Sequence, residues 1–302
     1  MKQMAVLALL SLIGLGSRAL AGAAKEAGPE PTKENVSYGP DERNVMDFWK
    51  AAGEGPRPVV ISIHGGGWLN GDKRSARNTE LKKLLDMGIS VVAINYRLSG
   101  KNPLPAPVHD AARAVQFVRF MSKEWNIDPA RVALTGGSAG GCSTLWIALH
   151  DDMQDKNSPD PVLRESSRVT AAVADAAQTS IDPKVITDWI GPKVIDHAMI
   201  RSAVGSGSNQ DMTDNYAKYE KLYKEFSPIN HVDKNDPPIL LRYSFSAPPK
   251  GTNEAIHHAN FGIKLKEASD KVGHECYLYY PGGPASKYRY AEEFLKAKLL
   301  AK

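Results

Sequence analysis

The sequence predicts an α/β fold in which a mostly parallel sheet is covered by helices on both faces. Short apolar runs of strand length alternate along the chain with stretches whose apolar residues recur at helical spacing. The strand runs are almost continuously apolar, which is typical of parallel strands buried on both faces. With 302 residues, of which 42% are hydrophobic, the chain is long enough to bury one large core.

A polar linker, residues 22–35, precedes the first predicted element, a hairpin. Its strands are 36–39 and 44–50, with Gly39-Pro40-Asp41 near the turn. Residues 58–64 are a largely apolar strand rich in valine and isoleucine, which favour strands. The next predicted elements are a helical stretch at 75–87 and an apolar strand at 89–96.

The middle of the chain continues the alternation. A helix is predicted over 108–125, because its apolar residues recur at helical spacing. A short apolar strand, 131–134, and a helix, 142–149, follow it and are separated by a glycine-rich turn. Residues 169–177 form the next predicted strand.

The last third holds the remaining core elements and one long segment of mixed composition. The core elements are strands at 237–243 and 275–280 and helices at 259–272 and 289–301. The long segment, 178–236, is expected to have structure of its own, because structureless loops of this length are uncommon between core strands. It is either a lid or cap over a site or a set of peripheral helices. His197 lies within it, where it could contact a ligand or lie on the surface.

Residues 1–21 have the pattern of a secretory signal peptide. Lys2 gives a short basic start, residues 4–16 are almost wholly apolar, and Ala19-Leu20-Ala21 offers a cleavage site. The apolar run is too short for a membrane span, and a membrane-anchoring helix is the alternative. The sequence therefore predicts a secreted or periplasmic protein with no stable membrane insertion.

Charge and cysteine content exclude some partners. Without residues 1–21, which hold two basic residues and no acidic one, 36 basic and 34 acidic residues remain. No basic patch with interleaved aromatic residues is present, so nucleic acid is not an expected partner. Cys142 and Cys276 are expected to be two small buried side chains, with a disulfide as the alternative. His257 and His258 are adjacent and lack a third ligand at suitable spacing, so no metal is expected.

Ser138 lies at the centre of Gly136-Gly137-Ser138-Ala139-Gly140, a complete G-x-S-x-G motif. An apolar strand precedes the motif and a helix follows it, which is the context of a nucleophile elbow. The glycines on either side of the serine keep side chains out of a tight turn. The motif predicts a serine nucleophile that attacks an acyl carbon.

A second glycine-rich motif, HGGGW at residues 64–68, directly follows an apolar strand. Acyl transfer builds a tetrahedral oxyanion, which preorganised backbone N–H groups stabilise. Gly66 and Gly67 can supply such donors, and Ala139, the residue after the serine, can supply another. His64 precedes the glycines, so its side chain is expected to order the loop and not to act as the catalytic base.

Three segments together resemble the α/β-hydrolase esterases. They are ISIHGGGWLNGDK at 61–73, NYRLS at 95–99 and GGSAGG at 136–141. The resemblance is to the HGGG-bearing branch related to hormone-sensitive lipase and to the exported feruloyl and acetyl-xylan esterases, over about residues 36–300. It implies an eight-stranded, mostly parallel sheet, a serine esterase without a cofactor, and a triad in the order serine, acid, histidine.

The same resemblance assigns roles to residues of this chain. Residues 36–302 become one hydrolase domain, with 178–236 as a possible cap insertion. Ser138 is the implied nucleophile. The implied oxyanion donors are Gly66, Gly67 and Ala139.

The acid of such a triad should lie between the strand 237–243 and the helix that begins at Ala259. Counting back from the end of that helix places Glu254 where the family usually has aspartate. A glutamate can orient a histidine as an aspartate does. Counting forward from the strand leads instead to Ser246 and Ala247, where no acid is present. The alternative for Glu254 is a solvated loop carboxylate.

The histidine of such a triad should follow the last strand, but residues 280–290 contain none and none follows. Ala285 or Tyr288 occupies the expected place. A serine without a base is a weak nucleophile at neutral pH. Either a displaced histidine or another proton acceptor replaces the missing base, or the protein hydrolyses esters poorly. The candidate replacements are His257, His258, Tyr288 and Lys287.

Two functional hypotheses follow from the sequence. In the first, an exported serine carboxylic-ester hydrolase acts on a small-molecule or polysaccharide-borne ester, and the resemblance alone suggests acetyl or feruloyl groups. In the second, a hydrolase-fold protein has lost its base and binds ligands in the retained pocket. The motifs leave the acyl and alcohol specificity and the oligomeric state open.

Overall fold

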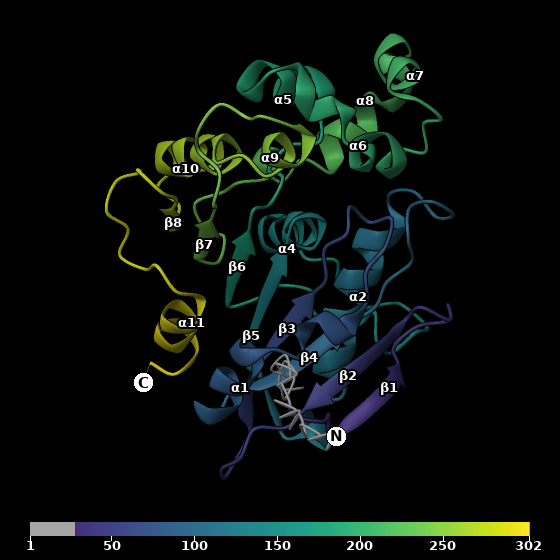
Figure 1. Cartoon of the computed structure of the whole chain (residues 1–302). Coiled ribbons are helices and arrows are strands. Elements are labelled where there is room, and N and C mark those ends of the chain that lie inside the picture. Colours follow the sequence, from purple (N-terminus) through teal and green to yellow (C-terminus); the bar gives the residue numbers. More distant parts are fainter. Residues whose placement is uncertain (1–27, 302) are drawn as a thin grey trace, which may run out of the picture.

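An eight-stranded sheet runs through the molecule in the order β1-β2-β4-β3-β5-β6-β7-β8 (Figure 1). The computed structural model describes residues 28–301, so the predicted signal peptide lies outside the described residues. The strands are β1 (Lys33–Ser37), β2 (Val45–Trp49), β3 (Arg57–Ile63), β4 (Ser90–Ile94), β5 (Ile127–Gly137), β6 (Ala171–Asp175), β7 (Ile239–Arg242) and β8 (Cys276–Tyr279).

The strand directions confirm the predicted mostly parallel sheet. β2 pairs antiparallel with β1 and with β4, which gives the expected opening hairpin. The five pairings from β4 through β3 to β8 are parallel. The carboxyl ends of β3 to β8 therefore meet at one edge of the sheet, where ligands bind in open α/β sheets.

Each of the five predicted helical stretches contains a helix, and the structure describes eleven α-helices. They are α1 (Thr79–Asp86), α2 (Ala106–Phe120), α3 (Ser122–Trp125), α4 (Ala139–Leu149), α5 (Pro183–Ile190), α6 (Ala198–Ala203), α7 (Asn209–Asp214), α8 (Tyr216–Glu225), α9 (Thr252–Ile256), α10 (Asn260–Val272) and α11 (Ala291–Leu299). Of these, α5 to α9 have no counterpart among the predicted helices. The stretch predicted as one helix at 75–87 is divided, because the Asn78 side chain accepts the N–H groups of Glu80 and Leu81 and so begins α1. A 3₁₀ turn, Lys73–Ala76, precedes it.

Two apolar cores cover the two faces of the sheet. On one face, α1 and α11 pack against the strands through Leu81, Leu84 and Phe294. On the other face, α2, α4 and α10 pack through residues that include Val115 and Leu145. Burial on both faces explains the continuous apolar strand runs.

The long segment 178–236 contains α5 to α8. Figure 1 shows these helices together with α9 beyond the ends of β5 and β6, on the far side of α4.

Cys142 and Cys276 are free and buried, as expected. Among the described helices, none combines the length and apolar character needed to cross a bilayer.

Candidate active site

Ser138 occupies the turn between β5 and α4 with a strained backbone. Its φ is 53° and its ψ is −125°, a conformation that non-glycine residues rarely adopt. The Ser138 N–H donates to the carbonyl oxygen of Asp175 (2.8 Å). A Cβ added at Gly140 would overlap the carbonyl oxygens of Ile63 and His64. The glycine is therefore needed for the turn to lie against the end of β3.

The HGGG loop lies directly beside this turn. A Cβ built on Gly65 would lie 3.4 Å from Cβ of Ser138. Gly66 and Gly67 both have positive φ (96° and 63°), which favours glycine. Within residues 28–301, no hydrogen-bond acceptor is found for the N–H groups of Gly66, Gly67 and Ala139. These three donors are thus available to an oxyanion formed at Ser138.

Two buried aromatic residues fasten the HGGG loop to the rest of the fold. Trp68, at the end of the loop, donates from its indole Nε1 to Ser143 Oγ in α4 (2.9 Å). Tyr96, after β4, donates from Oη to the carbonyl oxygen of His64 (2.7 Å). Buried hydrogen bonds of this kind hold a loop in one conformation, which is a condition for preorganised oxyanion donors.

His64 serves the loop and not the reaction. Its ring stacks on Tyr96 with centroids 4.2 Å apart, and its Nδ1 lies 2.8 Å from the carbonyl oxygen of Gly65. Burial lowers the pKa of His64 to about 4, with a contribution from the neighbouring Arg43 guanidinium and against the opposing effect of the Gly65 carbonyl. A ring that is neutral and engaged with its own loop matches the structural role predicted for His64.

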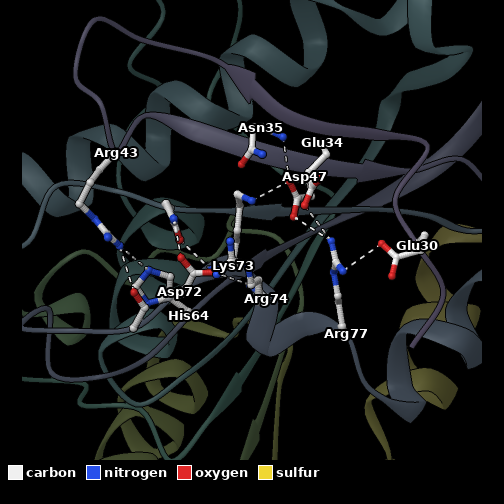
Figure 2. Close-up of polar contacts among 12 residues, drawn as sticks. Glu30, Glu34, Asn35, Arg43, Asp47, His64, Asp72, Lys73, Arg74 and Arg77 are labelled. Atoms are coloured by element: carbon white, nitrogen blue, oxygen red, sulfur yellow. Dashed lines mark hydrogen bonds and ion pairs between the residues drawn. The ribbon is translucent and has the colours of Figure 1, made fainter. Parts of the chain in front are cut away.

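A buried charge network holds the segment that follows the loop (Figure 2). Lys73 Nζ lies 2.7 Å from Asp47 Oδ1, and the two side chains are 2% and 0% exposed. The Lys73 N–H donates to Asn95 Oδ1 (2.7 Å), and Asn95 Nδ2 donates to Asp72 Oδ2 (2.9 Å). The sequence GDK after HGGGW is thereby tied to β2 and to the end of β4.

His257, one of the candidate displaced bases, lies at the nucleophile. Its Nε2 is 2.8 Å from Ser138 Oγ. It immediately follows α9, the short helix between β7 and α10. The structure therefore brings an imidazole to the serine from a position after β7, where the resemblance places the acid, instead of after β8.

The contact of the second ring nitrogen of His257 shows which of the two nitrogens carries the proton. Nδ1 lies 2.8 Å from the carbonyl oxygen of Asn253, one turn earlier along the chain. A carbonyl oxygen only accepts, so Nδ1 carries the proton and Nε2 presents a lone pair to Ser138 Oγ–H. Burial lowers the pKa of His257, and the Asn253 carbonyl opposes this in part. The ring is therefore a neutral acceptor at pH 7, as a general base requires.

Glu254, predicted as the acid, takes a different partner. Its Oε2 accepts the N–H of Lys250 (2.8 Å) at the start of α9. Among the hydrogen bonds and ion pairs of residues 28–301, none joins a carboxylate to His257. Glu254 and His257 are three positions apart, a spacing at which helix side chains can meet. Here the Glu254 carboxylate instead binds the backbone of the loop before α9. The contact to Nδ1 is made by the Asn253 carbonyl.

The other candidate bases lie elsewhere. His258 is buried, with Nε2 3.2 Å from the carbonyl oxygen of Ala247 and Nδ1 accepting the N–H of Asn260 (3.1 Å). Tyr288 is partly buried and packs edge-on against Tyr277 and against Phe294 of α11. The loop after β8 thus contributes to the far face of the sheet.

His197, for which the sequence allows either a ligand contact or a surface position, lies near the site. It is half-buried, and its ring centroid is 6.4 Å from that of His257. A Cβ built on Gly67 would lie 3.7 Å from His197 Cε1.

The sequence does not reveal this position of His197, because nothing in the pattern tells where the segment 178–236 folds back onto the HGGG loop. The Asn253 carbonyl was missed as well, because any residue offers a carbonyl.

Comparisons with known proteins identify the family of this chain. Residues 46–245 match the model of a family described as BD-FAE. The chain is 32% identical over 214 residues to the probable carboxylic ester hydrolase LipM of Mycobacterium tuberculosis, covering 68% of this chain and 46% of that protein. It is 26% identical to the versiconal hemiacetal acetate esterase of Dothistroma septosporum, covering 84% of this chain and 74% of that one. The chain spans about half the length of the first curated relatives that it matches.

Solved structures share the fold. A truncated carbohydrate esterase from gut microbiota superimposes with a TM-score of 0.68 and 23% identity, covering 84% of this chain and 90% of that chain. An acetyl ester-xyloside bifunctional hydrolase from Caldicellulosiruptor lactoaceticus gives a TM-score of 0.62 and 24% identity, covering 83% and 85%. At identities below 25%, the likeness to these two structures shows a shared fold and nothing more specific.

Proposed function

The chain belongs to the BD-FAE family of α/β-hydrolase esterases, and we propose that it is a serine carboxylic-ester hydrolase that works with a Ser138–His257 dyad. The observation that carries the proposal is the 2.8 Å contact between Ser138 Oγ and the unprotonated Nε2 of His257. The alternative, a binding protein without a base, is motivated only by the missing histidine after β8. An imidazole that reaches the serine from α9 removes that motive.

The first half of the proposed reaction acylates the serine. Ser138 Oγ attacks the acyl carbon while its proton passes to His257 Nε2. The N–H groups of Gly66, Gly67 and Ala139 donate to the oxyanion of the tetrahedral intermediate. His257 then gives its proton to the leaving alcohol oxygen, the bond from that oxygen to the acyl carbon breaks, and an acyl-enzyme remains.

The second half repeats these steps with water. A water molecule attacks the acyl carbon and gives a proton to His257 Nε2. The tetrahedral intermediate collapses, the bond to Ser138 Oγ breaks, and the proton returns to Oγ as the carboxylic acid leaves. No cofactor is needed for this sequence of proton transfers.

The dyad differs electrostatically from a triad. The Asn253 carbonyl fixes the tautomer of His257, which is one role of the acid in a triad. It carries a partial charge, so it stabilises the imidazolium less than a carboxylate would. The proposed enzyme therefore depends more strongly on its oxyanion donors for rate.

The substrate class and the location are further parts of the proposal. Two structural neighbours are named a carbohydrate esterase and an acetyl ester-xyloside bifunctional hydrolase, which supports acetyl esters of polysaccharide as substrates. Feruloyl esters are proposed from the sequence resemblance alone. The pattern of residues 1–21 supports export to the periplasm or outside the cell. An exported esterase of this kind would meet polysaccharide-borne esters directly.

The proposed function is tested with the mature chain on p-nitrophenyl acetate. Ser138→Ala should lower kcat by about 10⁴-fold, and a fluorophosphonate probe should label the wild type but not the variant. Ser75→Ala, which changes an exposed serine in the 3₁₀ turn before α1, is the matched control. Equal rates for Ser138→Ala and the wild type would refute the proposal.

A further inference from the structure

His197 presents a hydrogen-bond donor that the fold does not use. The residue precedes α6, and its Nδ1 accepts the N–H of Met199 (3.3 Å), so the ring caps this helix. An accepting Nδ1 is unprotonated, and the proton of the neutral ring is then on Nε2. In the part of the chain that the structure describes, Nε2 has no hydrogen-bond partner.

The ring lies near both of the groups that handle the reacting oxygens. Gly67, an oxyanion donor, faces His197 Cε1, which would be 3.7 Å from a Cβ at that glycine. His257, the base, faces it with ring centroids 6.4 Å apart and an angle of 67° between the rings. His197 therefore borders both the oxyanion donor and the base, from the side of the segment 178–236.

His197 remains neutral under ordinary conditions. Burial lowers the pKa of His197. The charge of His257, when that ring is protonated, and the permanent charge of Arg201 lower this pKa further. A neutral ring is a donor through Nε2–H without being a counter-ion, so it suits a hydroxyl better than a carboxylate.

The reaction geometry decides which part of a substrate this donor meets. The oxyanion lies at Gly67 and Ala139, and the leaving alcohol oxygen lies at His257 Nε2, which must protonate it. A group that borders both positions contacts atoms just beyond the leaving oxygen. In a polyol or sugar ester, the next polar atom there is the hydroxyl on the adjacent carbon.

We propose that His197 Nε2–H donates a hydrogen bond to the hydroxyl next to the ester in the alcohol part of the substrate, so that the site prefers esters of polyols and sugars to esters of simple alcohols. The inference rests on the proposed esterase function and deepens it. A site with a donor placed for a hydroxyl discriminates against an analogue without one, because the donor is then left unpaired.

The test separates this contact from the capping role of His197. His197→Ser removes the imidazole but keeps a side-chain oxygen that caps α6 well. Wild type and variant are compared on glycerol monoacetate, which has a hydroxyl next to the ester, and on propyl acetate, which has none. The variant should lose about tenfold in kcat/KM on glycerol monoacetate and change less than about twofold on propyl acetate.

Each other outcome has a definite meaning. Equal losses on both esters would overturn the inference, because a structural role affects both substrates alike. No loss on either ester, or a wild type without preference for glycerol monoacetate, would overturn it as well. A wild type that hydrolyses p-nitrophenyl acetate but neither of these two esters would overturn the inference alone, whereas a wild type that is inactive on all three would refute the proposed function.

Discussion

The two halves of the candidate site are built in different ways. The nucleophile and its oxyanion donors lie at the ends of β3 and β5, and backbone packing and buried side chains fix them. The base follows α9, a helix of five residues, and residues 244–248 just before it are exposed. The fold thus fixes where the serine must be, whereas any element that reaches the same edge of the sheet can deliver the base.

The base half nevertheless has its own anchors. Gln178, fully buried after β6, donates from Nε2 to the carbonyl oxygen of Ile256 (2.6 Å), next to His257. The Ala259 N–H donates to the carbonyl oxygen of Phe245 (2.7 Å), which closes the loop. These hydrogen bonds and the buried side chains of Ala255 and Ile256 hold α9 in place, whereas the nucleophile half is built on the sheet itself.

Removing the base is the largest expected perturbation of this arrangement. His257→Ala should lower kcat for p-nitrophenyl acetate by about 10⁴-fold, because no other group would take the Ser138 proton. Asn253→Ala is the matched control, since it keeps the backbone carbonyl that orients His257. It should change kcat less than about threefold. Activity that survives His257→Ala would show that another group is the base.

The sequence predicts the nucleophile half because its signals are local. Ser138, its flanking glycines and the HGGG loop each follow an apolar strand, and steric demands on those turns restrict which residues fit. The base half has no such local signature. His257 could be named only as one candidate among several, because a histidine after a short helix does not reveal where its ring points. The Asn253 carbonyl and the approach of His197 depend on tertiary packing that spacing does not encode.

A second prediction concerns how firmly the nucleophile half is held. Lys73→Met removes one partner of a buried ion pair and leaves Asp47 without its ammonium. Breaking such a pair from one side typically costs about 3–5 kcal/mol, and here the low end is expected because Asp47 also accepts the N–H of Asn35 (2.9 Å). Urea unfolding measures the change.

Lys82→Met is the matched control for that experiment. Lys82 also pairs with an aspartate, Asp86 (2.7 Å), but both side chains are more than half exposed. Solvent screening makes such a pair weak, so unfolding should be nearly unchanged. Equal stability of Lys73→Met and Lys82→Met would show that the network in Figure 2 does not hold the oxyanion loop.

The pH dependence of kcat/KM reports on the base half alone. Burial lowers the pKa of His257, so Nε2 is unprotonated above that lowered pKa and protonated below it. Activity should be flat near neutral pH and fall about tenfold per unit on the acid side, with a midpoint below about 6.5. Rates on p-nitrophenyl acetate from about pH 4.5 to 8 measure it. A midpoint above 6.5 would indicate that a carboxylate stabilises the imidazolium.

The smallest expected effect belongs to Glu254 and decides between a dyad and a triad. In a triad, replacing the acid by its amide lowers kcat by about 10⁴-fold, because the histidine loses its correct tautomer and its charge partner. In this chain the Glu254 carboxylate accepts the N–H of Lys250, and the Asn253 carbonyl orients His257. Glu254→Gln keeps an oxygen for Lys250, so kcat should fall by no more than about threefold. A loss of a hundredfold or more would mean that Glu254 turns toward His257 during the reaction. Glu254 would then be the acid of a Ser138–His257–Glu254 triad. That triad would be complete only when substrate is bound, whereas the nucleophile half is already in place without substrate.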